Sequence, residues 1–511
     1  MPKTLRLILG DQLNSAHSWL QHTNDEATYL MLEIMQEQEY VMHNVQKILA
    51  FFGAMRNFAH HLTKAGHRVI YLNLDDQGNE QDLEKNIKKI IKKEKIELFE
   101  YQLPDEYRLD EQLKDICKGL NINTGVADTE HFLTERMEVH DFFGGKKRYL
   151  MENFYRHMRS KNHILMHGDE PEGDRWNFDA DNRNKYDGKV PLQDALRFDH
   201  DVSSLKKMID KMGVKYFGGF DEEHLPWPLS RQEALKVLEY FCEHLLPHFG
   251  TYEDAMLQEH SSLFHSRISF AQNVKLISPA EIVGKVISHY QSNKNKISLA
   301  QVEGYIRQVI GWREFMRGVY WAHMPGYDQK NFFGHKTEIP HWFWDGKTKM
   351  NCLNKCITQS LDEAWAHHIQ RLMVIGNFAL LAGIDPDHVD AWYLGIYIDA
   401  IQWVEVTNTR GMSQFADGGI VGSKPYVASA AYINKMSDHC KHCHYNYKAR
   451  HGEKACPFNS LYWNFFDRNA DKLEKNPRIG MAYVTLKKMK PDEKEKTMLQ
   501  AETYLNNLNE L

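Results

Sequence analysis

The pattern of hydrophobic residues changes once along the chain, from short runs near the N-terminus to long amphipathic stretches after about residue 215. In the first 130 or so residues, short β-rich runs alternate with stretches of helical period. These runs predict four β-strands, at residues 5–9, 29–34, 69–72 and 98–101. Strands that alternate with helices form a parallel sheet, so we expect an α/β domain over residues 1–131.

The remainder of the chain divides into a polar segment and a helical one. Residues 132–215 are rich in Asp, Asn, Gly and Lys, which predicts a long interdomain linker with one helix near residues 148–159. Residues 216–511 predict an all-α domain. Its amphipathic runs lie at residues 230–248, 279–293, 299–321, 360–382 and 388–406.

The composition is that of a globular protein of two or three domains, with 511 residues of which 42% are hydrophobic. No run of eighteen apolar residues occurs, and the first ten residues lack the pattern of a signal peptide. We therefore expect no membrane partner and a cytoplasmic location. The net charge of -6 argues against a generally basic nucleic-acid-binding protein, although the 28 histidines and local Lys/Arg clusters leave room for a basic face.

Cysteines carry the clearest chemical signal. Seven in so long a chain are too few for a disulfide scaffold, and a clustered subset indicates metal binding. Four of them follow the order C-x87-C-x2-C-x12-C and end before Pro457: Cys352, Cys440, Cys443 and Cys456. A [4Fe-4S] cluster needs four cysteines and zinc accepts the same set, so spacing leaves both open. We interpret Cys117, Cys242 and Cys356 as spare thiols.

Three further motifs resemble one protein family. Ile310-Gly311-Trp312-Arg313-Glu314-Phe315 is similar to a helix that lines the flavin pocket of photolyases and cryptochromes. The stretch from Asp399 to Glu405, followed by Asn408-Thr409-Arg410-Gly411-Met412, is similar to the family's flavin-embracing segment. With Leu9-Gly10-Asp11-Gln12-Leu13 and the four cysteines, the chain resembles the iron-sulfur bacterial cryptochrome and photolyase group, the bacterial (6-4) photolyases, from end to end.

This resemblance implies a fold and a reaction. The family joins an α/β antenna domain, with a Rossmann-like parallel sheet, through a long linker to an all-α FAD-binding domain. Its members repair (6-4) pyrimidine-pyrimidone photoproducts in DNA with light. The resemblance therefore implies FAD, a [4Fe-4S] cluster, a 6,7-dimethyl-8-ribityllumazine antenna and UV-damaged DNA as the partner of a monomeric enzyme.

Two adjacent histidines are the candidate catalytic residues. Helical spacing places His368 on one stripe with Leu361, Trp365 and Leu372, which by itself indicates a core histidine. The resemblance instead implies that His368 donates a proton to the lesion, with His367 beside it, because an imidazole titrates near neutral pH. Tyr426 resembles a third pocket residue that hydrogen-bonds the lesion.

The resemblance also implies which residues hold FAD. A phosphate-binding turn is expected at His260, Ser261, Ser262 and Leu263, although the stretch departs from the family's usual Thr-Ser-x-Leu-Ser-Pro-Tyr. Arg313 would line the flavin pocket. Asp399 would accept a hydrogen bond from ring N3, and Glu405 would face N5 and tune flavin protonation.

The remaining candidate residues serve electron transfer, the antenna and DNA. Trp392, Tyr393 and Trp344 would relay electrons to photoexcited flavin. Antenna ligands are expected at the ends of the first two strands, where α/β sheets present them: Asp11, Gln12, Glu37 and Tyr40. In the linker, Arg175, Asp179 and Arg183 would fill the gap left by the flipped bases, and Asp179 could attract a divalent cation.

Two rival functions stay open at this point. A blue-light photoreceptor would keep flavin and cluster but signal instead of repairing, because fold does not fix function. An iron-sulfur DNA-binding module would lack photochemistry altogether. The pair His367-His368 favours repair over signalling, and the Trp312-Arg313 and Asp399 to Glu405 segments argue against the binding module.

Overall fold

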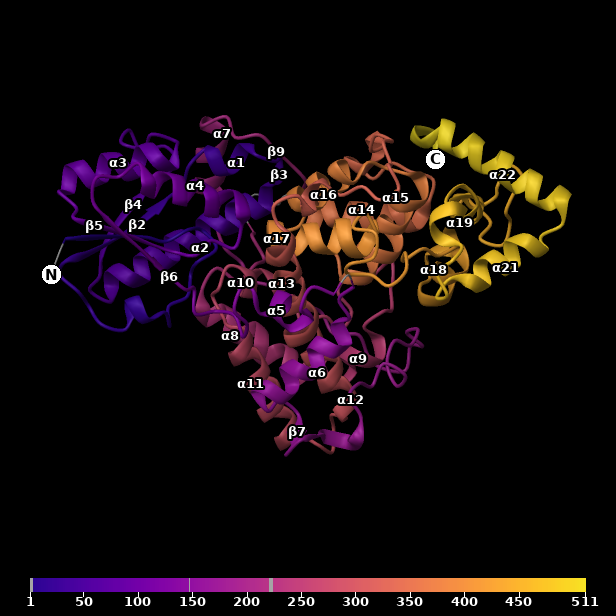
Figure 1. Ribbon diagram of the computed structural model, residues 1–511, viewed down its shortest axis with the longest axis horizontal. Helices are drawn as coiled ribbons and strands as arrows, with labels where there is room; N and C mark the ends of the chain where they lie inside the picture. The colour runs from indigo at the N-terminus through magenta and orange to yellow at the C-terminus, as the bar shows by residue number, and fades with distance from the viewer. Residues whose placement is uncertain (1–2, 147, 220–223) are drawn as a thin grey trace.

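The N-terminal part of the molecule is built on a five-stranded parallel sheet (Figure 1). The computed structural model describes residues 3–146, 148–219 and 224–511. The strands are β1 (Thr4–Leu7), β2 (Ala27–Leu32), β4 (Arg68–Leu72), β5 (Leu98–Gln102) and β6 (Asn123–Ala127), in the spatial order β4-β2-β1-β5-β6. The first four confirm the predicted strands, and β6 is an edge strand that the sequence analysis missed.

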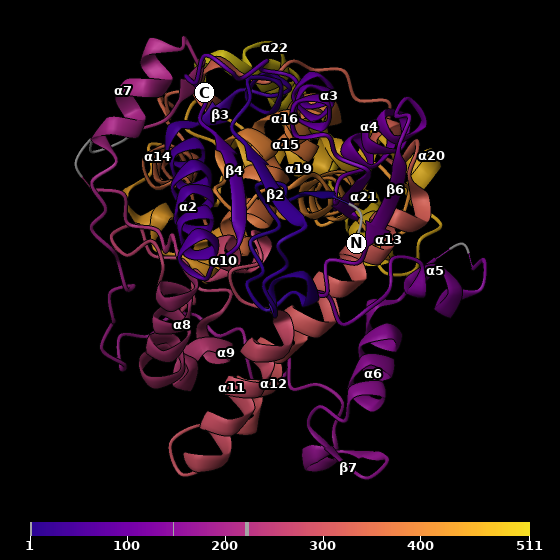
Figure 2. The same ribbon diagram turned by 90° about the vertical axis from the view of Figure 1, so that its left-hand side faces the viewer.

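Helices cover both faces of this sheet (Figure 2). α2 (Val45–Lys64) packs with Tyr29 and Met31 of β2. On the opposite face, α3 (Leu83–Glu94) and α4 (Tyr107–Lys118) pack with Leu30 and Leu32. Because successive side chains of β2 point to opposite faces, the whole strand is buried.

The linker contains more regular structure than its polar composition predicts. The helix expected near residues 148–159 is present as α6 (Met151–Asn162). The linker also contains α5 (Glu138–Phe143), α7 (Ser203–Lys211) and the hairpin of β7 (Met166–His167) and β8 (Glu170–Pro171). Directly after it, β9 (Tyr216–Phe217) pairs in parallel with β3 (His43–Asn44) of the α/β domain, which also contains α1 (Gln36–Glu39). The end of the linker contacts the α/β domain, because β9 pairs with β3 and α7 packs on α2.

The rest of the chain is helical, as predicted. Its helices are α8 (Arg231–Tyr240), α9 (Phe249–Tyr252), α10 (Ser269–Asn273), α11 (Pro279–Ser292), α12 (Leu299–Ile306), α13 (Glu314–His323), α14 (Asn351–Glu363), α15 (Asn377–Ala382), α16 (Pro386–Ile396), α17 (Gln402–Val406), α18 (Ala430–Met436), α19 (Pro457–Arg468), α20 (Ala470–Leu473), α21 (Gly480–Lys488) and α22 (Pro491–Asn506). No helix within the described ranges is long and apolar enough to span a membrane.

Two predicted helices are interrupted, at residues 364–367 and 397–401. α14 ends at Glu363 because Ala364 adopts a left-handed conformation, with φ of 48°. The amide of Ile398 donates to the carbonyl oxygen of Ala364 at 2.8 Å, so a hydrogen bond joins the two interrupted segments. The prediction of one helical stripe from Leu361 to Leu372 is therefore wrong, since a tertiary hydrogen bond replaces the local helical ones.

Candidate active site

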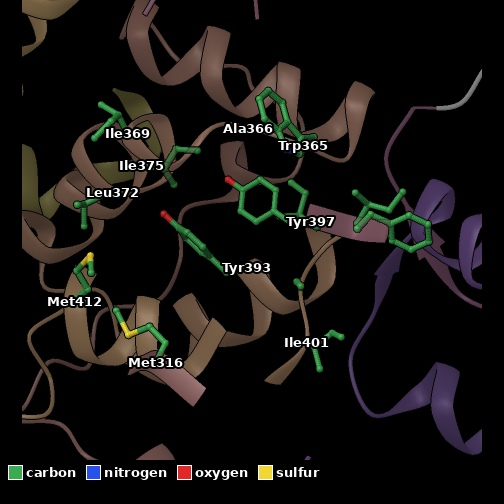
Figure 3. Close-up of a cluster of buried hydrophobic side chains, with 14 of the residues drawn as sticks. Met316, Trp365, Ala366, Ile369, Leu372, Ile375, Tyr393, Tyr397, Ile401 and Met412 are labelled. Atoms are coloured by element: carbon green, nitrogen blue, oxygen red, sulfur yellow. The ribbon is translucent and has the colours of Figure 1, made fainter. Parts of the chain in front are cut away.

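A cavity of about 530 Å³ lies in the helical domain. Three π-helical segments contribute to its wall, Arg307–Arg313, Gln370–Gly376 and Thr407–Ser413. Such segments are frequent at functional sites. Figure 3 shows part of the apolar wall, where Met316 and Met412 lie near Tyr393. The volume is in the range of cofactor and small-molecule sites.

Both predicted histidines line this cavity, and they reach it from the break after α14. The ring of His368 is open to the cavity. Removal from bulk water, together with the positive charges of Arg371 and Arg183, lowers the pKa of His368 to about 4. The imidazole is thus neutral at pH 7 until a negative charge approaches it.

His367 is buried, with 2% of its surface exposed. Its ring stacks on that of His265, with centroids 4.6 Å apart and planes 14° apart. Neither ring nitrogen of His367 has a hydrogen-bond partner in the described structure. Burial, followed by the neighbouring imidazoles of His265 and His368, holds the pKa of His367 well below its ordinary value.

Tyr426 and Arg183 also line the cavity. Burial raises the pKa of the Tyr426 phenol, which keeps it a hydrogen-bond donor. Arg183 donates to Glu253 at 2.9 Å and pairs with Asp179 at 3.2 Å. This part of the linker therefore reaches the same cavity as the two histidines.

The other two predicted linker residues, Arg175 and Asp179, do not line the cavity. Arg175 pairs with Asp181 at 2.6 Å, and its guanidinium lies 4.2 Å from the ring centre of Phe178. Both partners of the ion pair are about half exposed. Arg175 and Asp179 remain candidates for contact with DNA outside the cavity.

A partly buried arginine, Arg371, joins the two predicted flavin carboxylates. Arg371 pairs with Asp399 at 3.0 Å and with Glu405 at 3.5 Å, and all three line the cavity. Ser269 donates to Asp399 at 2.6 Å. Burial raises the pKa of Glu405 to about 8, although Arg371 opposes that shift. One cation thus holds two carboxyl groups at fixed positions on the cavity wall.

Arg313, the predicted residue of the flavin pocket, is on the wall as well. One of its terminal nitrogens lies 3.0 Å from Nε2 of His131. The guanidinium lies 4.7 Å from the ring centre of Phe132 and 5.1 Å from that of Trp403. Burial lowers its pKa to about 10, so the group remains charged.

The predicted phosphate-binding turn, residues 260–263, lies away from the wall of this cavity. Ser261 donates to Glu363 at 3.1 Å, and the ring of His260 accepts from the amide of Leu263. Ser262 and Leu263 are buried in the protein core. These four residues therefore precede the segment that lines the cavity and do not line it themselves.

The segment that follows this turn does line the cavity, through Ser266, Arg267 and Ser269. Arg267 is 5% exposed, and its guanidinium lies 4.3 Å from the ring centre of Trp227. Its Nε and Nη2 have no hydrogen-bond partner in the described chain. Because unpartnered buried donors are costly, this site favours an anionic ligand.

Aromatic side chains lead from the cavity toward the surface. Tyr393 lines the cavity, and its ring contacts that of Trp392 with centroids 5.3 Å apart. Trp392 contacts Phe343 at 5.3 Å, and the next residue, Trp344, is 39% exposed. Tyr393 and Trp392 are therefore in ring contact beside the cavity, and Trp344 is partly exposed next to Phe343 in the chain.

A second cavity, of about 140 Å³, lies at the carboxyl ends of β1 and β2. Asp11, Glu37 and Tyr40 line it, as predicted for an antenna site. Gln12 is absent from its wall and is buried, since its side-chain amide donates to the carbonyl oxygen of Gln102 at 3.2 Å. Ala400 and Ile401 of the helical domain close the other side, so both domains form this cavity.

The interface beside this second cavity contains a buried cation. Lys275 has no exposed side-chain surface and pairs with Asp105 at 2.6 Å and with Asp11 at 3.2 Å. Lys275 belongs to the helical domain, whereas both carboxylates belong to the α/β domain. A buried charge cluster therefore fixes the two domains to each other.

The four predicted cysteine ligands meet around a small third cavity. Cys352 lies on α14, Cys440 and Cys443 flank one turn, and Cys456 precedes α19. Burial raises the pKa of Cys440 to about 12. Within the described ranges, no three His, Cys, Asp or Glu side chains form a group that could hold a metal ion.

Comparison with known proteins shows the family. The chain is 41% identical to the (6-4) photolyase of Agrobacterium fabrum over 510 residues, which cover 99% of each chain. It belongs to the (6-4) photolyase family. A family model described as deoxyribodipyrimidine photo-lyase-related protein matches residues 6–225.

Solved structures confirm the fold. A bacterial class III photolyase from Agrobacterium tumefaciens superposes with a TM-score of 0.55 at 15% identity, covering 96% of this chain and 98% of that one. A cryptochrome from Synechocystis sp. PCC6803 gives a TM-score of 0.56 at 14% identity, covering 100% of this chain and 94% of that one. Both likenesses establish the arrangement of an α/β domain and a helical domain, as predicted.

Sequence reasoning missed two arginines that line this site, Arg267 and Arg371. Arg267 stands in His265-Ser266-Arg267-Ile268-Ser269, which matches the family's Thr-Ser-x-Leu-Ser wording at both serines and has Ile for Leu. This match begins at His265, five residues after the start of the predicted turn at residues 260–263. Arg371 offered no comparable signal, because its partners are distant in the chain.

Proposed function

We propose that this protein is a light-driven (6-4) photolyase in which His368 protonates the lesion. The observation that carries the proposal is that His368 opens onto a cavity that also contains Asp399 and Glu405, the two carboxylates of the flavin segment. Full-length similarity to a (6-4) photolyase supports the same reaction. A structural likeness to a cryptochrome supports only the fold.

The residues of the large cavity fit FAD. The unpartnered nitrogens of Arg267 suit a pyrophosphate, and Ser266 beside it adds a hydroxyl. Asp399 offers a carboxylate oxygen to a ring N–H, and Glu405 lies in the same buried cluster. FAD, reduced and excited by light, would supply the electron that enters the lesion.

We infer that His368 acquires its proton when the substrate binds. Removal from bulk water and two arginines lower the pKa of the ring to about 4, so a neighbouring anion is needed to charge it. DNA phosphates near Arg183 would supply that negative charge as the flipped lesion enters. His368 would then hold the proton at the moment of repair, and Tyr426, which lines the same cavity, would donate a hydrogen bond to the lesion.

The four thiols, which line one small cavity, suit a [4Fe-4S] cluster held by four cysteines. Visible absorbance that outlasts flavin removal and disappears on iron chelation would distinguish the cluster from colourless zinc. In the second cavity, Asp11, Glu37 and Tyr40 offer polar groups that suit the amide-like edges of a ribityllumazine antenna.

This function assigns a role to each region of the chain. Residues 1–131 would form the antenna domain, 132–215 the linker and 216–511 the FAD domain. Arg175, Asp179 and Arg183 would contact DNA as it delivers the lesion. The exposed Trp344 and the buried pair Trp392-Tyr393 would conduct electrons from solvent to the flavin.

The experiment is direct. Purified, reduced protein is mixed with an oligonucleotide that contains one (6-4) photoproduct, under blue light and in the dark, and restored thymines are counted by chromatography. Repair in light alone supports the proposal. Flavin absorbance changes without restored thymines would contradict it and would favour a photoreceptor.

A further inference from the structure

The turn that leads to the catalytic histidines makes few hydrogen bonds within itself. Residues 364–367 lie outside any helix. The main-chain oxygen of Ala364 accepts from Ile398, and that of Ala366 accepts from Arg371 at 2.7 Å. The ring of His367 has no polar partner among the described residues. The carbonyl oxygen of His367 accepts from the N–H of Arg371 at 3.2 Å, which leaves the N–H of the peptide that joins Ala366 to His367 in need of a partner.

One buried glutamine supplies that bond. Oε1 of Gln370 accepts from the main-chain N–H of His367 at 3.0 Å. Gln370 is 2% exposed and is absent from the cavity wall, so it holds the turn from behind. A buried amide with fixed partners restrains rotamers and orientation.

The same glutamine is bonded to α14. Gln370 donates to Oε1 of Gln359 at 2.7 Å, and Nε2 of Gln359 donates back to Oε1 of Gln370 at 3.2 Å. Nε2 of Gln359 also donates to the main-chain oxygen of Trp365 at 3.2 Å. The two side chains thus form a reciprocal amide pair that fastens both ends of the histidine turn to one helix.

α14 is also the helix that contributes Cys352 to the cysteine cavity. Gln359 follows Cys352 by seven residues, which is two helical turns on the same side of α14. The helix is therefore a rigid connection between the cysteine cavity and the amide pair. A helix whose first turn is anchored presents its later residues at fixed positions.

We propose that Gln370, locked by Gln359, is the positioning residue that sets the His367-His368 turn, so that α14 couples order at the cysteine site to the alignment of the proton donor. This inference rests on the proposed repair function. In this inference the cysteine site affects catalysis through the position of α14, without contacting the lesion. Neither glutamine touches substrate, and both act through the histidine turn.

The test compares three variants with the wild-type holoenzyme in light-driven repair. Gln370→Leu removes every bond of the amide, and we expect kcat to fall about tenfold while KM for DNA changes less than about twofold, because alignment and not binding is lost. Gln370→Glu keeps the acceptor for His367 and should recover kcat to within about threefold. Gln359→Leu should reduce kcat in the same direction.

The two positions should not act independently. If the glutamines work as one pair, the double variant Gln359→Leu/Gln370→Leu has the kcat of Gln370→Leu alone. Asn86→Leu serves as the matched control, since Asn86 is a fully buried carboxamide that lines neither large cavity. We expect Asn86→Leu to lower thermal stability and leave kcat unchanged.

A second readout is independent of repair. Histidine labelled with ¹³C at Cε1 reports each ring by NMR, and His367→Gln and His368→Gln assign the two signals. Gln370→Leu should move both signals, and Asn86→Leu should move neither. Unmoved signals, wild-type kcat in Gln370→Leu, or a loss that Gln370→Glu fails to recover would each overturn the inference. Absence of repair by the wild type would instead refute the proposed function, and the NMR comparison would still decide the positioning role.

Discussion

Replacement of Arg371 by methionine tests the electrostatic centre of the site. The substitution keeps an unbranched side chain and removes the cation that pairs with Asp399 and Glu405. The side chains of these two acids are 9% and 3% exposed, so bulk water cannot replace the interaction that each carboxyl group loses. Breaking a buried ion pair by removing one member costs about 3–5 kcal/mol, and we expect the free energy of unfolding to fall by that amount.

The loss should depend on pH, and the sign follows from Glu405. Its pKa is about 8 in the folded protein and 4.5 ordinarily, so the folded state binds more protons between these values and stability falls as pH rises through that range. Arg371 opposes this shift. Without it the folded pKa rises further, and the deficit of Arg371→Met should grow above about pH 8.

Urea unfolding followed by tryptophan fluorescence at pH 6 and pH 9 measures both effects, and the FAD retained on purification reports the site itself. Arg371→Lys keeps a positive charge and should recover part of the stability. As a matched control, Arg68→Met removes a half-exposed arginine from its pair with Glu94 and should cost about 1 kcal/mol or less. A loss below about 1 kcal/mol in Arg371→Met, or a deficit that shrinks at pH 9, would refute the reasoning.

Three other outcomes follow from the same structure. Lys275→Met removes the shared cation from Asp11 and from the buried Asp105, which keeps only Arg317 at 3.7 Å, and should lower the free energy of unfolding by about 3 kcal/mol, as urea unfolding would show. Cys352→Ala should abolish bound iron in elemental analysis, whereas Cys356→Ala, which lies on α14 outside the cysteine cavity, should retain it. Trp392→Phe should slow flavin photoreduction, followed by absorbance, while Trp463→Phe, which is also buried but lies on α19, should not; equal rates would contradict the proposed route.

Much of the fold follows from the hydrophobic pattern. β1, β2 and β5 are rich in buried apolar residues, β4 has four partly buried ones, and the alternation of these strands with helices predicts parallel pairing. β6 was missed because its residues Asn123–Ala127 are largely exposed at the edge and carry little apolar pattern. Local sequence gave no sign of the break at Ala364, since alanine favours helix and a hydrogen bond from Ile398 decides its conformation.

The candidate site shows the same division between local and distant information. His367, His368 and the four cysteines could be identified from motifs, because spacing carries the signal. The role of Arg371 could not, since it depends on carboxylates that approach only in the folded chain. Gln12 illustrates the converse, because it stands beside Asp11 in sequence while its side chain turns toward the main chain of β5.

The most direct test of the central claim measures repair by His368→Ala. Wild type and variant are brought to equal FAD content, mixed with an excess of the (6-4) oligonucleotide and exposed to the same dose of blue light. If His368 donates the proton, the variant should restore thymines at least about 100-fold more slowly than the wild type. Equal rates in the two proteins would contradict the account.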